Sequence, residues 1–360
     1  MSDNKSNIFY GLLVSALLAV ISQLVSSYAG VYLFGFKKSP ISPILIALVF
    51  GIVLGNKFDF QTKYGPGINF CIKYVLKFGI ILMGIRLGLM DLLGFGMKSL
   101  LVVFPCILIS LLISKKIANL FKIESGLASL IAVGTSICGA SAIIAFSSTI
   151  PVKKNEVVFA IANITVFGIF AMLFYPLVAK LLFQEDFISS GIFLGGSIHE
   201  TAQVAGAGLI YAQQYSQPQV LEIATLTKLI RNTAMVFVIP YMAFKQNYIS
   251  SSQSLMRHIK SIFPIFILGF IGLGILRTIG DLGINDFGLA YGILDSAKWT
   301  TLISNITELS KFFLIMAMAS IGLSTNIETI KSVKINIFGY GLFMSLIVGL
   351  LSLFLIFLIK

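Results

Sequence analysis

Charged residues are scarce in this chain of 360 residues. Asp, Glu, Lys and Arg together make up 11% of it, whereas hydrophobic residues make up 57% and the mean hydropathy is +0.98. A soluble globular domain carries roughly 25% charged residues. The shortage of charge therefore excludes a soluble enzyme or binding domain and predicts an all-α polytopic membrane protein.

Motifs that define other classes of membrane protein are missing. There is no HExxH zinc motif, because HETAQ (199–203) lacks the second histidine, and there is neither a GxSxG motif nor a nucleotide-binding loop. We therefore expect neither an intramembrane enzyme nor an ATP-driven pump, and no cofactor. A channel would need a continuous polar stripe through several spans, whereas the polar residues here concentrate at two or three points.

Cysteine is also rare. Cys71, Cys106 and Cys138 lie in or at the edge of apolar segments, without CxxC spacing or a neighbouring histidine. This excludes a disulfide framework and a metal site, and it predicts free thiols. Because no Ser/Pro-rich linker or low-complexity tail divides the chain, we expect one membrane domain over 1–360.

Apolar segments fill most of the chain. A membrane-spanning helix needs about 20 predominantly apolar residues, and eleven segments qualify. They lie at 8–29, 41–55, 70–90, 98–113, 125–150, 156–182, 189–212, 222–244, 260–279, 299–323 and 335–359. The first has only a weakly basic flank and a long apolar stretch, so we expect a retained helix rather than a signal peptide.

The net charge of +12 does not form one basic patch, because Lys and Arg lie mostly at the ends of spans. This disfavours a nucleic-acid partner. With the N-terminus in the cytoplasm and the C-terminus outside, four basic loops fall on the cytoplasmic side, as the positive-inside rule requires. These loops hold Lys57/Lys63/Lys73, Lys115/Lys116/Lys122, Lys245/Arg257/Lys260 and Lys331/Lys334. Two loops, with Lys37/Lys38 and Lys153/Lys154, disagree with that orientation.

Small and polar residues interrupt the fifth apolar segment in the sequence GTSICGASA (134–142). Close helix packing would explain its glycines but not its hydroxyl groups. A helix broken inside the membrane explains both, since the free N–H groups of the second half-helix would attract an anion. The residues that this hypothesis assigns to substrate binding are Thr135, Ser136, Cys138, Gly139 and Ser141.

A second segment resembles the first. TSICGAS (135–141) aligns with ASIGLS (319–324), five spans later, and adds Ser320, Gly322 and Ser324 to the predicted binding site. An odd offset gives the two helices opposite orientations, which is typical of inverted-repeat transporters. A competing alignment pairs GTSI (134–137) with GGSI (195–198), and its even offset would indicate parallel copies instead.

Basic residues inside spans are costly and usually functional. Lys228 and Arg231 are spaced i, i+3 and share one helical face, so we assign both to substrate binding. They could also be flank charges if the eighth span begins later. Arg86 in the third span could extend towards the headgroups, and Lys311 could pair with Glu308.

Acidic residues inside spans are fewer, which favours an anionic substrate over a cation. His199 and Glu200 lie near the centre of the seventh span, and Gln203 shares a helical face with His199. Glu200 could neutralise Lys228 or Arg231, and it could equally carry a coupling proton with His199. A carboxylate that is paired in one state and protonated in another would do both.

Four motifs together resemble the YeiH-type family of bacterial inner-membrane proteins, described as sulfate exporters. They are GTSICGASAIIA with Pro151, GGSIHETAQVAGAG, KLIRNTAMV and AMASIGLST, in that order within residues 40–355. The resemblance implies the fold shared by bile-acid symporters and sodium/proton antiporters, with discontinuous crossing helices. It also implies an additional helix (1–30) followed by two inverted five-helix repeats, 41–182 and 189–360.

We therefore expect a secondary active transporter in the bacterial inner membrane. It would move sulfate or a related sulfur-containing or carboxylate anion, by export and alternating access, coupled to protons. The alternative is a sodium-coupled symporter of an organic anion, with Asn163, Thr165 or Ser141 and unwound carbonyls holding the ion. The expected partners are the anion, H+ or Na+ and the lipid bilayer, and a homo-oligomer stays open.

Overall fold

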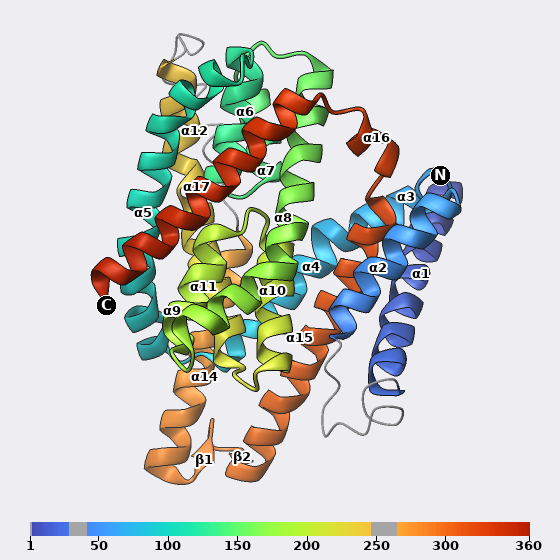
Figure 1. Ribbon diagram of the computed structural model, residues 1–360. Coiled ribbons are helices and arrows are strands. Elements are labelled where there is room, and N and C mark those ends of the chain that lie inside the picture. The colour runs from blue at the N-terminus through green and yellow to red at the C-terminus, as the bar shows by residue number, and fades with distance from the viewer. Residues whose placement is uncertain (1, 29–41, 246–264) are drawn as a thin grey trace. The chain divides into compact units, whose positions relative to one another are not determined.

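The computed structural model describes residues 2–28, 42–245 and 265–360 (Figure 1). Its helices in the first part of the chain are α1 (Ser2–Ser27), α2 (Pro43–Lys57), α3 (Phe60–Phe70), the π-helix η2 (Cys71–Val75), α4 (Leu76–Met83), the 3-10 helix η3 (Gly84–Arg86), α5 (Leu89–Leu120), α6 (Ser125–Ser136), α7 (Ala140–Ser147) and α8 (Lys154–Phe183). The later elements are α9 (Phe187–Ser197), α10 (Thr201–Gln214), α11 (Gln219–Thr233), α12 (Met235–Lys245), α14 (Phe266–Phe287), β1 (Leu289–Ala290), β2 (Leu294–Asp295), α15 (Ser296–Ser324), α16 (Ile327–Lys331) and α17 (Ile335–Ile359).

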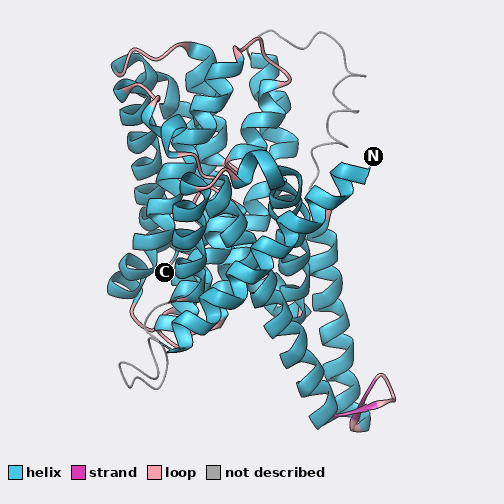
Figure 2. Ribbon diagram, turned by 90° about the vertical axis from the view of Figure 1, so that its right-hand side faces the viewer, coloured by secondary structure: helices cyan, strands magenta, loops and turns pink. Residues whose placement is uncertain are grey.

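Helices dominate the described chain, and short loops join them (Figure 2). Eight helical segments are long and apolar enough to cross a membrane. They are Asn7–Ser27, Phe60–Arg86, Leu89–Leu120, Lys154–Phe183, Gln219–Met242, Phe266–Phe287, Ser296–Ser324 and Ile335–Ile359. This confirms the prediction of an all-α polytopic membrane protein.

The other three predicted spans form shorter helices. The segment 41–55 is α2, 125–150 is divided into α6 and α7, and 189–212 is divided into α9 and α10. Each divided pair together has the length of one membrane span, about 20 residues. Of the predicted basic loop residues, Lys37, Lys38, Arg257 and Lys260 lie outside the described residues.

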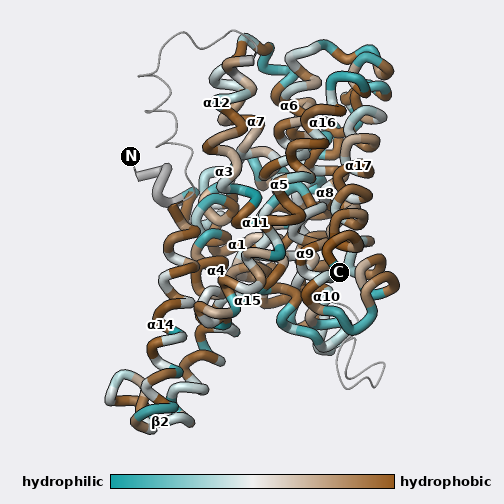
Figure 3. Tube along the Cα trace, turned by 90° about the vertical axis from the view of Figure 1, so that its left-hand side faces the viewer, coloured by the Kyte–Doolittle hydropathy of each residue, from teal (hydrophilic) through white to brown (hydrophobic). Residues whose placement is uncertain are grey.

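The chain forms two compact units. Unit 1 comprises 1–94, 208–222 and 265–327, and unit 2 comprises 95–207, 223–264 and 328–360. Both units draw on both of the predicted repeats, and α5, α10, α11 and α16 each pass from one unit to the other. Figure 3 shows apolar residues along the long helices and polar residues near β2, where a two-stranded hairpin joins α14 to α15.

Unit 1 is built around α15, which packs against α1, α2 and α4. The prediction of a broken helix at 319–324 is wrong, because α15 is continuous from Ser296 to Ser324. Gly322 lets α15 approach α2 closely, since a Cβ on Gly322 would lie 2.4 Å from the carbonyl oxygen of Leu48. Ser320 Oγ donates to Met316 O (3.0 Å), one turn earlier. The small and polar residues of this segment therefore serve helix packing and leave the helix intact.

Unit 2 has an apolar core formed by α5, α6, α7, α8, α12 and α17. Phe146 of α7 and Met344 of α17 are fully buried in it. Tyr340 of α17 is also buried, and its hydroxyl group donates to Ala128 O in α6 (3.2 Å). The three cysteines are buried free thiols, as predicted, and two of them, Cys106 and Cys138, lie in this unit. The core positions the broken helices α6/α7 and α9/α10.

Candidate functional site

The first break in unit 2 lies inside GTSICGASA, as the sequence predicts. Helix α6 ends at Ser136 and α7 begins at Ala140. Between them, Gly139 adopts φ 73° and ψ −131°, a conformation that an L-residue with a side chain rarely takes. A break of this kind leaves the last carbonyl groups of α6 and the first N–H groups of α7 without helical partners.

The second break separates α9, which ends at Ser197, from α10, which begins at Thr201. It corresponds to the competing alignment of GTSI (134–137) with GGSI (195–198), because α6 and α9 end at the same position of the two sequences. In both, the isoleucine that follows donates its N–H back into the helix, to Val133 O (3.1 Å) and Leu194 O (3.2 Å). This local match, and not the match with 319–324, identifies the two broken helices.

Arg231 of α11 binds both breaks. Its side chain is 1% exposed. From α6 it contacts Ser136 O through Nε (2.7 Å) and Thr135 O through Nη2. From α9 it contacts, through Nη1, Gly196 O (2.5 Å) and Ile198 O (3.3 Å). The guanidinium group therefore caps the carboxyl ends of two half-helices at once, where a positive charge is favourable.

Lys228, one helical turn earlier on α11, also binds carbonyl groups at both breaks, and it is fully buried. Its Nζ donates to Ile137 O (2.8 Å) beside α6 and to Ile198 O (2.8 Å) and His199 O beyond α9. The predicted shared face of Lys228 and Arg231 is thus confirmed. The ammonium group has three N–H donors, and all three have carbonyl partners, so Lys228 has no donor left for an anion in this structure.

Glu200 lies at the start of α7, and not in an ion pair with Lys228 or Arg231. A Cβ on Gly139 would lie 2.5 Å from Cγ of Glu200, and the carboxylate is within hydrogen-bonding reach of the Ala140 N–H. Glu200 also precedes α10, and its own N–H donates to Gln203 Oε1 (3.2 Å). A protein carboxylate therefore lies at the helix N-terminus that the sequence suggested for a bound anion.

His199 and Gln203 are buried and join the breaks to neighbouring helices. His199 Nε2 is hydrogen-bonded to Ser345 Oγ of α17 (2.7 Å), and the His199 ring also lies within hydrogen-bonding reach of the Thr135 backbone. Gln203 Nε2 donates to Thr165 O of α8 (3.2 Å). Next to them, Thr201 Oγ1 accepts from Asn232 Nδ2 of α11 (3.1 Å). Most polar groups of the crossing thus have partners within unit 2.

The predicted small-residue ligands differ in accessibility. Ser136 is buried and bonded to Ser110 Oγ of α5 (2.7 Å), and the thiol of Cys138 contacts Met235 Sδ (3.0 Å). Thr135 is buried, and its Oγ1 has no hydrogen-bond partner in the described part of the chain. Ser141, in the first turn of α7, is exposed. Of these side chains, Ser141 is therefore the one that a solute can reach.

The remaining predicted residues lie in unit 1. Ser320, Gly322 and Ser324 pack α15 and give no half-helix N-terminus. Lys311 pairs with Glu308 (2.7 Å), as the spacing predicts. Arg86 does not extend towards headgroups: its Nη2 lies 2.7 Å from Glu222 Oε1, and the Glu222 side chain is 4% exposed. Glu222 was not predicted as a functional residue, although it lies on α11 six positions before Lys228.

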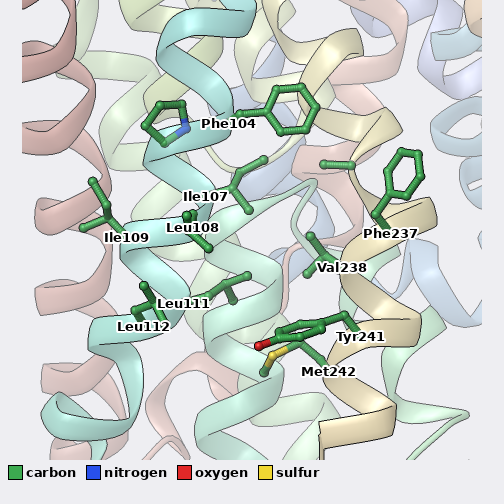
Figure 4. A pocket seen from close by; sticks show the side chains of 12 residues that line it. Phe104, Ile107, Leu108, Ile109, Leu111, Leu112, Phe237, Val238, Tyr241 and Met242 are labelled. Atoms are coloured by element: carbon green, nitrogen blue, oxygen red, sulfur yellow. The ribbon is translucent and has the colours of Figure 1, made fainter.

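An apolar cavity of about 670 Å³ lies between α5 and α12 in unit 2 (Figure 4). It was not predicted. Its walls are almost entirely aliphatic and aromatic, with Leu108 on one side and Phe237 on the other, and both side chains are more than half exposed. Such a lining suits hydrocarbon and offers an anion no positive charge, so the crossing of the broken helices is the stronger candidate site.

The sequence of the whole chain is similar to those of known bacterial membrane proteins. The chain matches the family described as Conserved hypothetical protein 698 over residues 10–341. It is 33% identical to a UPF0324 membrane protein of Fusobacterium nucleatum over 328 residues, which is 90% of each chain. It is 32% identical to one of Streptococcus agalactiae over 321 residues, 88% of each chain. One of Rhizobium meliloti is 28% identical over 330 residues, 91% of this chain and 85% of the relative.

Proposed function

The chain belongs to this family of bacterial multi-pass membrane proteins, and we propose that it is a secondary active transporter that moves a small anion together with a proton. The substrate class is sulfate or a related sulfur-containing or carboxylate anion. The proposed site is the crossing of α6/α7 with α9/α10. Alternating access is the proposed mechanism, because broken helices of this kind bind substrate in several transporter folds.

The observation that carries the anionic substrate is the balance of buried charge. Lys228 and Arg231 bring two positive charges into unit 2, and among the described residues of the crossing Glu200 alone brings a negative one. The half-helix ends do not change this balance, since two carboxyl ends (about −0.5 each) oppose two amino ends (about +0.5 each). An uncompensated buried charge is costly, so the crossing favours the binding of an anion.

The N-terminus of α7 is the proposed point of contact. Its first N–H groups have no helical partners, Ser141 is exposed there, and Ala140 and Glu200 are half-buried. The substrate would accept hydrogen bonds from these N–H groups and from the Ser141 hydroxyl group. Lys228 and Arg231 would attract the substrate electrostatically without touching it. This replaces the direct contact that the sequence suggested for them.

Glu200 supplies the coupling in this scheme. When ionised, its carboxylate takes the place at the α7 N-terminus that the substrate needs. A proton on Glu200 removes that negative charge, so anion and proton bind together and leave together. The titratable groups that interact with it in the crossing include Lys228 and Cys138, and His199 is its neighbour in the sequence. Net movement would then follow the combined gradients of the anion and the proton, so export, the expected direction, requires an outward anion gradient that exceeds the inward proton gradient.

The finer architecture is part of the proposal. If α2, α6/α7 and α9/α10 each cross the bilayer beside the eight longer helices, the chain has eleven spans. An N-terminal helix would then precede two inverted repeats, 41–182 and 189–360. The positions of the two broken helices do not support this division, because α6/α7 and α9/α10 are two predicted spans apart, whereas equivalent helices of two inverted five-helix repeats would be five spans apart.

Flux through proteoliposomes tests the function. A pH-indicator dye is enclosed in the vesicles, and sulfate, sulfite, thiosulfate or succinate is added outside. Anion uptake is then measured together with the internal pH. We expect at least one anion to enter with internal acidification, and Glu200→Gln to abolish the pH dependence of its flux. Glu308→Gln, at an exposed carboxylate of α15, is the matched control. Transport that keeps its pH dependence in Glu200→Gln would contradict the proposal.

The alternative of sodium coupling is tested in the same vesicles by replacing Na+ with choline. Among the suggested sodium ligands, the carbonyl of Thr165 already accepts from Gln203, and Asn163 Nδ2 donates to Ile337 O (2.8 Å), whereas Asn163 Oδ1 has no hydrogen-bond partner among the described residues. We expect flux to persist in choline. Flux that requires Na+ would favour the symporter instead.

A further inference from the structure

The carbonyl groups at the two breaks resemble the ligand set of a metal ion. Unwound carbonyls and the carboxyl ends of half-helices coordinate Na+ in transporters with broken helices. Here six carbonyl groups, those of Thr135, Ser136, Ile137, Gly196, Ile198 and His199, converge on Lys228 and Arg231 through seven hydrogen bonds. Two side-chain cations thus lie where such a fold would otherwise place a free cation.

The pattern of contacts is also symmetric in sequence. In the alignment of GTSI with GGSI, Thr135 corresponds to Gly196, and Arg231 binds both carbonyls. Ile137 corresponds to Ile198, and Lys228 binds both at 2.8 Å. Each cation therefore links equivalent positions of the two breaks. A bridge of this form fixes the crossing itself, whatever binds at the α7 N-terminus.

The hydrogen-bond inventory at Lys228 indicates a charged ammonium group. A protonated lysine has three N–H donors, and the structure gives Nζ three carbonyl acceptors. A neutral amine would turn a lone pair towards one of these oxygens. The cage around Nζ is thus shaped for an R–NH3+ ion.

We propose that Lys228 and Arg231 are tethered cations that replace a free metal cation at the crossing, and that removing the Lys228 side chain exposes a binding site for a primary alkylammonium ion. A metal ion placed beside two fixed cations would be repelled strongly in a buried site of low dielectric, so the wild-type crossing needs none. This inference concerns how the crossing is held together and does not depend on the proposed transport activity.

Chemical rescue of Lys228→Ala tests it. The variant retains Cβ and lacks three methylene groups and the ammonium group, which n-propylammonium replaces. We expect Lys228→Ala to unfold at a lower temperature than the wild type, and n-propylammonium to raise that temperature in a concentration-dependent way. Tetramethylammonium at equal ionic strength has no N–H donor and should have no such effect.

Two controls separate the cage from general effects of the salt. Lys228→Met fills the space without a charge, so it should be destabilised and should not respond to n-propylammonium. The wild type should unfold at the same temperature in sodium and in choline salts. This measurement tests whether the wild-type crossing binds a free metal cation even if Lys228→Ala cannot be purified. Equal responses to n-propylammonium and tetramethylammonium, or a wild type that sodium stabilises over choline, would overturn the proposal.

Discussion

The segments 135–141 and 319–324 have similar sequences and different structures. TSICGAS contains the end of α6, a break at Gly139 and the start of α7, whereas ASIGLS lies inside the continuous helix α15. In the first, Arg231 and Lys228 bind the free carbonyls. In the second, Ser320 and Ser324 donate to carbonyls of their own helix, Met316 O and Ile321 O.

The difference shows that small and polar residues permit a break in a helix but do not cause it. A break inside a membrane is stable only when the freed backbone groups find partners in the protein. In unit 2 those partners come from α11, far away in the sequence. In unit 1 α15 meets α2 at Gly51 and Gly322, and its backbone needs no external partner.

The largest effect is expected from removing a cation that binds the break. Arg231→Ala deprives the carbonyls of Thr135, Ser136 and Gly196 of their Arg231 donor, so we expect a loss of roughly 3 kcal/mol or more in the free energy of unfolding, at about 1–3 kcal/mol for each buried acceptor left unsatisfied. Lys311→Ala, which removes the surface pair of α15, should cost about 1 kcal/mol or less. Denaturation in detergent measures both. Equal losses would contradict the distinction between the two segments.

Gly139 tests whether the break depends on its backbone conformation. At φ 73° an alanine is strained, and its Cβ would also meet Glu200, so Gly139→Ala should lower the free energy of unfolding by about 1–3 kcal/mol. Gly272 of α14 has open space around it, and Gly272→Ala should be neutral or stabilising by up to about 1 kcal/mol. The same unfolding measurement applies. A Gly139→Ala variant as stable as the wild type would mean that the break does not depend on the positive φ of Gly139.

Ser141 and Ser320 allow a hydroxyl group proposed to bind substrate to be compared with one that only packs a helix. Ser141→Ala should leave stability nearly unchanged and weaken sulfate binding about tenfold or more, because a hydrogen bond to a charged group contributes about 1.5–3 kcal/mol. Ser320→Ala, which loses its bonds to Met316 O and Ser15 Oγ, should cost about 1 kcal/mol in stability and leave sulfate affinity unchanged. Calorimetric titration and thermal unfolding of both variants distinguish the roles, and the reverse pattern would refute them.

The smallest effect is expected at the start of α9, where the Asp186 side chain accepts from Ser189 N (3.0 Å). Partial burial raises the pKa of this carboxyl group, but bonds from Ser189 and Lys360 outweigh it and hold the pKa below its ordinary value. Asp186→Ala should therefore cost about 1 kcal/mol or less at neutral pH, given the exposure of the group. The lowered pKa means that this stabilisation is lost as the pH falls below about 4. If the free energies of unfolding of the wild type and Asp186→Ala differ by the same amount at pH 7 and at pH 3, a stabilising charge on Asp186 is excluded.

Local sequence predicted much of this structure. The length of the apolar segments identified the eight long helices, and the mixture of glycine and hydroxyl residues identified the break at Gly139. The i, i+3 spacing placed Lys228 and Arg231 on one face of α11, and Glu308 beside Lys311. These features depend on neighbours within one or two helical turns, which a sequence shows directly.

Features that depend on distant partners were not predictable in the same way. The sequence around Ser320 did not reveal that α2 packs against it, and nothing near Arg86 pointed to Glu222 as its partner. The choice between the two alignments of GTSICGAS depended on which carbonyls Arg231 reaches. That choice is a property of tertiary packing, and the resemblance in small residues favoured the wrong segment.

The most direct test of the proposed site measures the protons taken up when an anion binds. Calorimetric titration of the purified wild type with sulfate, and with the other anions of the flux panel, in buffers of different ionisation enthalpy gives this number. We predict about one proton taken up per bound anion in the wild type at a pH where Glu200 is ionised, and none in Glu200→Gln. Anion binding without proton uptake in the wild type, or with the same uptake in Glu200→Gln, would contradict the assignment of Glu200 and the α7 N-terminus as one coupled site.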